Sequence, residues 1–394
     1  MVQISLVGKT NVGKSTFFKA ATLADVEISN RSFTTIKPNT GVAYVKTPCA
    51  CKDLPGKIEC KQCCKGTRFV PVKLYDVAGL IEGAHEGKGL GNQFLSDAME
   101  SQALIHVVDI SGSTDADGIQ VKAGTYDPKN DIEMLKNEID YWILGLLKKD
   151  WRIISGTGHT DESFVETIAN RLGGLAISAE QIKIALNKVR EYFGKAASQW
   201  EDEDLMDFVT KIREESKPIL IAGNKYDVKS SQENIEAIKE EVIPCSAEIE
   251  LALREASMEL DLISYIPGES EFKLKPDAKP NEKQAKGIEF MKHYLEKYDN
   301  TGVQQTLDKT IFELLNMIVV YPVADEHKYT DKKGNILPDA HLVPKGTTAK
   351  EFAFRVHEDI GSKFISAVDC KKHQNISADH ELQDGDIICI KAAK

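Results

Sequence analysis

The segment 8–15, Gly-Lys-Thr-Asn-Val-Gly-Lys-Ser, constrains this chain more than any other part of it. An apolar run over residues 2–7 ends at Gly8, and Lys14 and Ser15 open a segment with helical spacing. The pattern Gly-x4-Gly-Lys-Ser thus lies between a predicted buried strand and a predicted helix, which is the context of a phosphate-binding loop. Glycines let backbone amides turn inward, and the helix start adds its positive dipole end. The alternative is a simple glycine turn that closes a βα unit.

This loop also predicts how a polyphosphate and a metal ion are held. The Lys14 ammonium would reach the β- and γ-phosphates, and the Ser15 hydroxyl would hold Mg²⁺. A second hydroxyl for Mg²⁺ would come from the polar loop 30–41, where Thr35 is our choice and Thr34 the alternative. The residues of the first loop that we expect to bind nucleotide are Gly8, Asn11, Val12, Gly13, Lys14, Ser15 and Thr16.

The pattern Asp76-x-x-Gly79 follows a predicted strand over residues 69–76. We expect the Asp76 carboxylate near Mg²⁺, usually through water, and the Gly79 amide at the γ-phosphate. Glycines recur at positions 79, 83, 87, 89 and 91, so ordering this stretch costs much backbone entropy and we expect it to be loose until a ligand holds it. The residues that we expect to carry the phosphate chemistry are Lys14, Thr35 and Gly79, and those at Mg²⁺ are Ser15, Thr35 and Asp76.

A purine-reading motif follows a predicted strand over residues 218–223. Asn-Lys-x-Asp at residues 224–227 suits guanine, because the Asp227 carboxylate can accept from the ring N–H and the 2-amino group. Adenine lacks the 2-amino group, so a carboxylate left unpaired penalises ATP. Lys225 would pack over the base, Asn224 would tie its loop to the phosphate turn, and Ser246 with Ala247 would contact the guanine oxygen.

Five cysteines fall between the predicted strands 42–46 and 69–76, at positions 49, 51, 60, 63 and 64. Four thiolates at such spacings, from Cys49, Cys51, Cys60 and Cys63, can close a tetrahedral Zn²⁺ site. A redox-active cluster and ordinary reduced cysteines in a hairpin extension are the alternatives. The insert is rich in turn residues and too poor in apolar residues to fold alone.

Length and composition indicate two or three domains in an ordinary globular chain of 394 residues with a net charge of −11. The acidic balance argues against a general nucleic-acid binder, so contact with RNA needs local patches or shape. A strand from residue 2 leaves no room for a signal peptide, and no apolar run approaches the ~18 residues of a membrane span. We therefore expect a cytoplasmic location, no membrane partner and, for the oligomeric state, a monomer.

The chain divides into segments of different pattern. Residues 1–126 and 218–316 read as one α/β domain, with the cysteine hairpin at 47–68. Residues 127–217 read as a helical insertion, with predicted helices at 133–149, 162–172 and 179–196 and another opening at 201. Residues 317–394 read as a small α+β domain. The remaining predictions are helices at 93–101, 232–241, 282–298, 303–315 and 349–360, a linker at 267–280, and a hydrogen-bonded core histidine at 106.

The motifs together make the chain resemble the Obg-like GTPases, in the YchF-related branch that carries a TGS domain. The resemblance rests on residues 8–15, on Phe-Thr-Thr-Ile-x-Pro-Asn at 33–39, on the glycine-rich run 76–91 and on Asn-Lys-x-Asp at 224–227. It implies a P-loop GTPase domain with a helical insertion, followed by a ubiquitin-like β-grasp (TGS) domain. It also implies hydrolysis of GTP or ATP and association with ribosomes or RNA.

Three positions qualify this resemblance. The YchF branch can replace the motif aspartate and accept ATP, but Asp227 is present here, so GTP is favoured. Leu80 stands where Ras-like proteins have a glutamine that orients water, and an aliphatic side chain cannot polarise water, so we expect slow intrinsic turnover. Asn11 matches a position that holds K⁺ in some GTPases of the wider class, so a potassium requirement is a further expectation.

Two functions remain open at this point. The first is a GTP-binding protein that hydrolyses GTP to GDP and phosphate and acts as a nucleotide-dependent switch on ribosomes or RNA in translation. The second is a nucleotide-sensing RNA- or ribosome-binding module whose hydrolysis is incidental or directed to ATP.

Overall fold

The computed structural model describes residues 1–23, 40–55, 60–80, 82–88, 91–157 and 160–393. Thr35 and its alternative Thr34 therefore lie outside the described residues. Among the described residues, the helices include none with both the length and the apolar character that crossing a bilayer requires.

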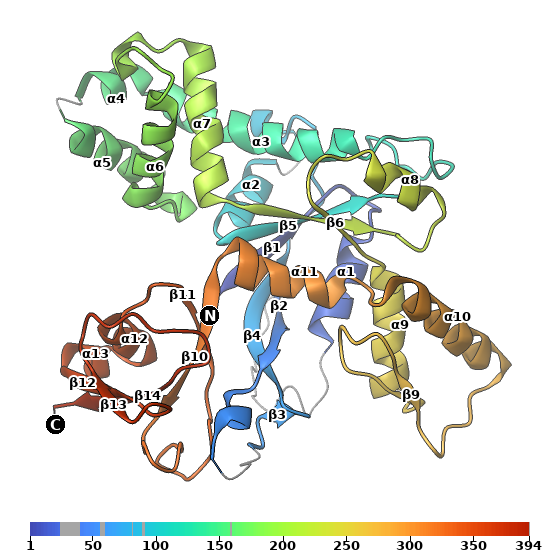
Figure 1. The fold of residues 1–394 in the computed structure, drawn as a ribbon. Helices are drawn as coiled ribbons and strands as arrows, with labels where there is room; N and C mark the ends of the chain where they lie inside the picture. The colour runs from blue at the N-terminus through green and yellow to red at the C-terminus, as the bar shows by residue number, and fades with distance from the viewer. Residues whose placement is uncertain (24–39, 56–59, 81, 89–90, 158–159, 394) are drawn as a thin grey trace.

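A seven-stranded sheet organises the larger part of the described chain, in the order β2-β4-β1-β5-β6-β7 with β3 paired to β4 (Figure 1). The strands β1, β4, β5, β6 and β7 run parallel, whereas β2 and β3 are antiparallel to β4. Every residue of β5 is buried, as its apolar sequence requires for a strand covered on both faces. The bounds are β1 Gln3–Val7, β2 Thr40–Pro48, β3 Cys63–Cys64, β4 Thr67–Asp76, β5 Ala103–Asp109, β6 Ile219–Asn224 and β7 Val242–Pro244.

Helices cover this sheet, and α1, α8 and α9 each follow the carboxyl end of one of its parallel strands. Helix α1 starts directly after β1 and the phosphate-loop sequence, and it packs against α9. Carboxyl ends of parallel strands share one edge, where α/β folds bind ligands. The bounds are α1 Lys14–Thr22, α2 Gly91–Met99, α3 Lys129–Lys148, α8 Ser230–Glu236, α9 Ala247–Met258, α10 Glu282–Tyr298 and α11 Val303–Lys309, which a π-helical turn, Thr310–Leu314, extends.

The helical insertion lies above the sheet in Figure 1. It comprises α4 Trp151–Thr157, α5 Asp161–Arg171, α6 Ala179–Arg190 and α7 Asp202–Ser216, reached through the long helix α3. Its centre is aromatic: the Trp200 ring stacks on Trp151 at 5.7 Å and meets the Phe208 edge at 5.2 Å. This cluster continues into the core beside α2, so the insertion is packed onto the sheet domain.

The C-terminal part forms a five-stranded sheet in the order β11-β10-β14-β12-β13, with two short helices (Figure 1). Strands β10 and β14 are parallel, and the other pairs are antiparallel. The bounds are β10 Met317–Val323, β11 His341–Pro344, α12 Ala349–Val356, α13 Glu358–Ser362, β12 Phe364–Asp369, β13 Gln374–Ile376 and β14 Ile387–Ala392. The fold class expected from the sequence, a P-loop α/β domain with a C-terminal β-grasp domain, is confirmed.

Several element boundaries differ from the predictions for local reasons. Helix α6 ends at Arg190, before the predicted 196, and α8 ends at Glu236 instead of 241. The predicted helix 349–360 is two helices, because His357 adopts an extended backbone and its ring accepts from the Asp359 amide at 3.2 Å. Helices α4 and α9 were not predicted, and the linker 267–280 contains β9 Lys273–Leu274, which pairs with β8 Ile263–Ser264.

His106 differs from its prediction in one respect. It lies in β5 and is 1% exposed, as expected of a core residue, but its Nδ1 has no hydrogen-bond partner among the described residues. Burial lowers the pKa of His106 to about 3, so the ring is neutral. The prediction that this histidine is hydrogen-bonded is therefore wrong for that nitrogen.

Candidate nucleotide-binding site

The loop between β1 and α1 has the backbone that its glycines predict. Gly8, Asn11 and Gly13 have φ angles of 148°, 61° and 90°, which glycine adopts at the least cost. A side chain at Gly13 would overlap the Asn224 amide, so the close approach of these two segments also requires glycine there. Helix α1 begins at the next residue, and its unpaired first-turn amides make this end of the loop a site for an anion.

A cavity of about 730 Å³ opens at this loop, on the edge where the parallel strands end. Its walls come from the loop, the end of β4, the end of β6 and the start of α9. The lining residues are Lys9, Thr10, Asn11, Gly13, Lys14, Ser15, Thr16, Asp76, Val77, Ala78, Gly79, Gln120, Asn224, Lys225, Asp227, Val228, Ser246 and Glu248. Of the predicted nucleotide-binding residues, Gly8, Val12 and Ala247 are not part of this lining. Thr35, predicted for Mg²⁺ and for the phosphate chemistry, lies outside the described residues.

Lys14 and Asp76 form an ion pair at the phosphate-loop end of the cavity. The Ser15 hydroxyl donates to the other Asp76 oxygen at 3.0 Å. The Lys14 and Asp76 side chains are only 10% and 13% exposed, yet both border the cavity. Lys14 and Ser15, which the sequence assigns to phosphate and Mg²⁺, are therefore both bonded to Asp76, the carboxylate expected near Mg²⁺.

Asn224 joins the two ends of the cavity. Its Nδ2 donates to the Val12 carbonyl at 2.8 Å, and its Oδ1 accepts from the Ala247 amide at 3.0 Å. Val12 and Ala247 thus contribute backbone groups that hold Asn224. At the far end, the Ser246 hydroxyl donates to Asp227 at 2.8 Å, which fixes one carboxylate oxygen of an exposed side chain.

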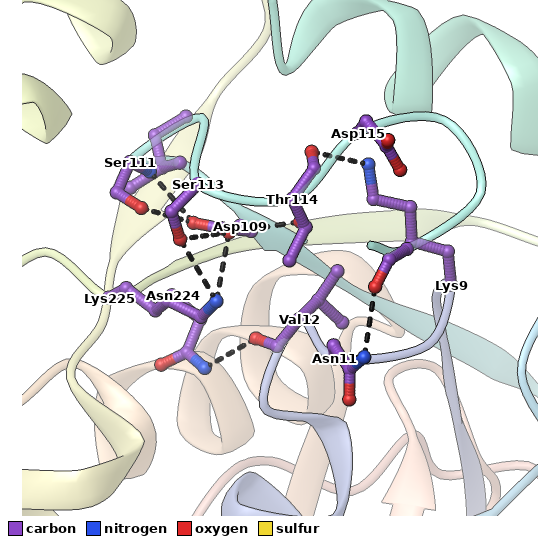
Figure 2. Close-up of polar contacts among 12 residues, drawn as sticks. Lys9, Asn11, Val12, Asp109, Ser111, Ser113, Thr114, Asp115, Asn224 and Lys225 are labelled. Carbon is purple, nitrogen blue, oxygen red and sulfur yellow. Dashed lines mark hydrogen bonds and ion pairs between the residues drawn. The ribbon is translucent and has the colours of Figure 1, made fainter. Parts of the chain in front are cut away.

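Lys225 is held by Asp109, a residue that the sequence analysis did not single out (Figure 2). The Lys225 ammonium lies 2.9 Å from Asp109 Oδ2 and 3.2 Å from the Ser113 hydroxyl. The buried Asp109 carboxylate also accepts from hydroxyls of Ser111, Ser113 and Thr114 at 2.5, 2.8 and 2.9 Å. Burial alone would raise the pKa of Asp109, but these hydrogen bonds and Lys225 lower it overall. An aspartate at a strand end followed by Ser-x-Ser-Thr was the available signal.

The loop after β5 also closes over the phosphate loop (Figure 2). Asn11 Nδ2 donates to the Gly118 carbonyl at 2.9 Å, and Lys9 Nζ donates to the Thr114 carbonyl at 3.1 Å. Lys9 is buried, pairs with Asp131 of α3 at 2.8 Å and lies 4.0 Å from the centre of the Tyr126 ring. The phosphate loop is therefore fixed from the side of β5 and α3 as well as by its own glycines.

The glycine-rich stretch after Asp76 is anchored at both ends of its described part. Leu80 is 1% exposed, packs in the core beside α2 and donates its amide to the Gly8 carbonyl at 3.0 Å. Glu138 of α3 accepts from the Gly83 amide at 2.6 Å and the His85 amide at 2.9 Å. The His85 ring stacks on Tyr141 with 5.0 Å between centroids. We expected this stretch to be loose until a ligand holds it, but in residues 82–88 Glu138 of the protein itself holds two backbone amides.

The four cysteines predicted as metal ligands form a separate group at the end of the β2–β4 hairpin. The Cys49 and Cys60 sulfurs are 3.5 Å apart, and those of Cys51 and Cys63 are 3.7 Å apart. All four sulfurs lie within 4.8 Å of one another.

Family models match three consecutive parts of the chain. Residues 3–144 match a model described as 50S ribosome-binding GTPase. Residues 222–325 match the G4 motif-containing domain of an Obg-like GTPase, and residues 327–392 match the TGS domain.

Two of the similar proteins span all or nearly all of the chain, and a third covers about a third of it. An uncharacterized GTP-binding protein of Methanocaldococcus jannaschii is 45% identical, with 100% of both chains covered. An uncharacterized GTP-binding protein of Schizosaccharomyces pombe is 34% identical over 93% of this chain and 92% of its own. The ribosome-binding ATPase YchF of Escherichia coli O157:H7 is 39% identical over 34% of this chain and 35% of its own.

Solved structures agree with this grouping. The crystal structure of a GTP binding protein from Pyrococcus horikoshii OT3 covers 100% of both chains at 34% identity and a TM-score of 0.76. The YchF GTPase of S. pombe covers 99% of this chain and 97% of its own at 17% identity and a TM-score of 0.54, which supports the fold alone. The chain therefore belongs to the Obg-like GTPases, in the YchF-related group that combines a P-loop GTPase domain with a TGS domain.

Proposed function

We propose that this protein binds GTP with Mg²⁺, hydrolyses GTP to GDP and phosphate, and acts as a nucleotide-dependent switch on the ribosome. One observation carries the proposal: the phosphate-loop residues, Asp76 and Asp227 border the same cavity of about 730 Å³. Asn224 links the base-reading loop directly to the phosphate loop through the Val12 carbonyl. A single purine triphosphate can therefore contact both ends.

At the phosphate end, binding of the triphosphate and Mg²⁺ would separate the existing Lys14–Asp76 ion pair and give each residue a new partner. Lys14 would turn from Asp76 to the phosphates, while Asp76 and Ser15 would hold Mg²⁺, with Thr35 as the further hydroxyl. Each buried charge keeps an opposite charge beside it through this exchange, which avoids the cost of leaving one unpaired. Lys14, Thr35 and Gly79 remain the residues proposed for the chemistry at the γ-phosphate.

At the base end, Asp227 would select guanine. Ser246 holds one carboxylate oxygen, and the same short loop offers backbone amides for the guanine oxygen. Rejection of adenine follows because a carboxylate that loses one of its partners pays a desolvation cost of about 1–3 kcal/mol. Some relatives are named GTP-binding proteins and others ribosome-binding ATPases, and Asp227 places this chain with the former in our proposal.

Leu80 supports slow intrinsic hydrolysis. Its side chain is in the core, and an aliphatic group there cannot orient the attacking water. A partner that supplies the missing group would then control the switch, and the name of the matched model, 50S ribosome-binding GTPase, favours the ribosome or its RNA. The same leucine favours the second candidate, a nucleotide-sensing ribosome- or RNA-binding module with incidental hydrolysis. We propose a cytoplasmic monomer in either case.

K⁺ is a further proposed cofactor, near Asn11 at the rim of the phosphate loop. The Asn11 Nδ2 is already bonded to Gly118, which orients the amide group relative to the loop. GTP hydrolysis rates measured at equal concentrations of KCl and NaCl test whether K⁺ is a cofactor. Equal rates would remove K⁺ from the proposal.

The central test is base selection by Asp227. We expect the wild type to bind GTP much more tightly than ATP, and Asp227→Asn to lose GTP affinity and gain affinity for xanthosine triphosphate. The exposed Asp277→Asn, outside the cavity, serves as the matched control. A variant with unchanged GTP affinity, or one that does not accept xanthosine triphosphate, refutes the assigned role.

Ribosome co-sedimentation with a GTP analogue, with GDP and without nucleotide then separates the two candidates. Binding that depends on the nucleotide, together with faster hydrolysis on ribosomes, supports the switch. Binding that is the same in all three states supports the module.

A further inference from the structure

The cysteine group at the end of the β2–β4 hairpin has the dimensions of a tetrathiolate metal site. A tetrahedral zinc ion with Zn–S bonds of ~2.3 Å has sulfur–sulfur edges of about 3.8 Å. The measured separations are 3.5 Å for Cys49 and Cys60 and 3.7 Å for Cys51 and Cys63, and all four sulfurs lie within 4.8 Å of one another. These distances exceed the ~2.05 Å of a disulfide bond, and the residues are free cysteines.

The surroundings of the group fit a closed structural site. Cys49, Cys51 and Cys60 are 2%, 5% and 4% exposed, and Cys63 is partly buried. Four protein ligands fill a tetrahedral coordination sphere, so no position remains for a substrate. Two ligands come from the turn after β2 and two from the segment before β4, an arrangement that would close a hairpin too poor in apolar residues to hold itself.

Arg68 provides an independent indication that the group carries negative charge. This arginine of β4 is 3% exposed, and its Nη1 lies 4.0 Å from the Cys60 sulfur. Its other contacts are the Pro338 carbonyl at 3.3 Å and the Tyr321 ring, so among the described residues none of its partners is a carboxylate. A buried guanidinium needs an anion beside it. Four thiolates around one divalent ion leave a net charge of about −2, which meets that need.

The same hairpin contacts the C-terminal domain (Figure 1). Arg68 reaches Pro338 and Tyr321, and Lys371 forms an ion pair of 2.7 Å with Asp53. The hairpin residues Cys49, Ala50, Cys51, Leu54 and Cys60 share one core cluster with Tyr321, Leu337 and Ala340. The metal group is thus located where the two domains pack together.

We propose that Cys49, Cys51, Cys60 and Cys63 bind one structural Zn²⁺, with Arg68 as its buried counter-charge, and that this zinc hairpin holds the TGS domain against the GTPase domain. Zinc suits a site whose ligands are all thiolates and whose coordination sphere is closed. The proposal is independent of the nucleotide cavity, to which none of the four cysteines contributes.

Metal analysis of the full chain tests the first half of the proposal. The protein is purified in reductant without chelator, and one zinc per chain is expected. Cobalt exchanged into the same protein should give the intense absorption of a tetrahedral thiolate complex. Cys51→Ser should lose the bound zinc, whereas Cys64→Ser, at the adjacent cysteine outside the group, should retain one zinc per chain. If Cys51→Ser fails to fold, the zinc content of the wild type and its cobalt spectrum still show whether the group binds a metal.

Three results overturn the metal assignment: wild-type protein that stays free of zinc after reconstitution, a disulfide within the group found by mass spectrometry, or iron as the bound metal.

Hydrogen exchange with and without a chelator tests the second half. Zinc removal should speed amide exchange in residues 49–54 and at the facing residues 337–340, while α12, whose buried Ala349 and Phe352 belong to a separate core cluster, changes little. Faster exchange throughout the TGS domain would indicate general unfolding instead, and unchanged exchange at 337–340 in zinc-free protein would refute the role of zinc in holding the domains together.

Discussion

Glu138 holds the glycine-rich stretch after Asp76, and removing its carboxylate is the sharpest perturbation that the structure offers. One of its oxygens accepts from the Gly83 amide at 2.6 Å. The other accepts from the His85 amide at 2.9 Å and lies 2.7 Å from His85 Nδ1. Glu138 is 4% exposed, so water replaces it poorly. Glu138→Ala therefore leaves two backbone donors without their acceptor.

The expected size of the effect follows from those two donors. Each unsatisfied buried donor costs about 1–3 kcal/mol, and Gly83 is buried whereas His85 is partly buried, so the closed arrangement of residues 82–88 should lose ~2 kcal/mol relative to an opened one. Since ~1.4 kcal/mol is a factor of ten, this corresponds to about thirtyfold faster hydrogen exchange at the Gly83 and His85 amides. Glu138→Gln keeps one oxygen acceptor and should give a smaller increase.

Hydrogen exchange read by NMR or mass spectrometry measures this directly in nucleotide-free protein. Glu133→Ala is the matched control, because Glu133 is exposed on the same helix. If GTP must draw this stretch away from α3, the ratio of GTP to GDP affinity should also rise in Glu138→Ala. Exchange at residues 83–88 that equals wild type would refute the reasoning, since it would mean that Glu138 does not limit opening.

Two further predictions concern Asp109, which is buried, and Asp308, which is partly buried. In Asp109→Asn the amide cannot accept from all the donors around Asp109, so Lys225 should be released. GTP binding should weaken about tenfold or more, as the loss of one charged hydrogen bond of ~1.5–3 kcal/mol implies. Fluorescent-nucleotide titration measures this affinity beside the exposed control Asp117→Asn, and equal affinities of the two variants would contradict the prediction. Burial raises the pKa of Asp308 from 3.8 to about 6, so wild-type stability should fall by up to ~3 kcal/mol as pH rises through about 4 to 6. Asp308→Asn stays neutral and should abolish this fall in urea unfolding, whereas an identical pH slope would argue against it.

Local patterns were enough to predict the fold class and the family. The strand before Gly8 and the fully buried β5 are visible as apolar runs, because parallel strands covered on both faces need such runs. The phosphate loop and the base-reading loop are each contiguous in sequence, so their residues could be chosen without knowing the tertiary structure. Most of the chosen side chains border one cavity.

The residues that support the site could not be chosen in this way. Asp109 and Lys225 are separated by 116 positions, and Gly83 and Glu138 by 55, so each pairing depends on the completed sheet and on α3. Helix boundaries failed for a related reason: the ring of His357 caps α13, and nothing in the apolar spacing of 349–360 signals that break. Sequence periodicity indicates which face of an element is buried, whereas helix caps and long-range partners depend on individual contacts that periodicity does not encode.

Among the described residues, three lysine–aspartate pairs lie at the site, and the pairs differ in how deeply they are buried. Lys9 and Asp131 have side chains 2% and 3% exposed, and the Asp109 side chain that holds Lys225 is 1% exposed. The buried Lys9–Asp131 pair keeps its partners, because removing one leaves an uncompensated charge that costs about 3–5 kcal/mol. The buried Asp109 carboxylate likewise needs Lys225, although the Lys225 side chain is itself 24% exposed. The Lys14–Asp76 pair differs, since both side chains border the cavity, where an incoming phosphate and cation supply the opposite charges. Ligand binding can therefore exchange this pair, while the other two keep the phosphate loop and the base-reading lysine in place.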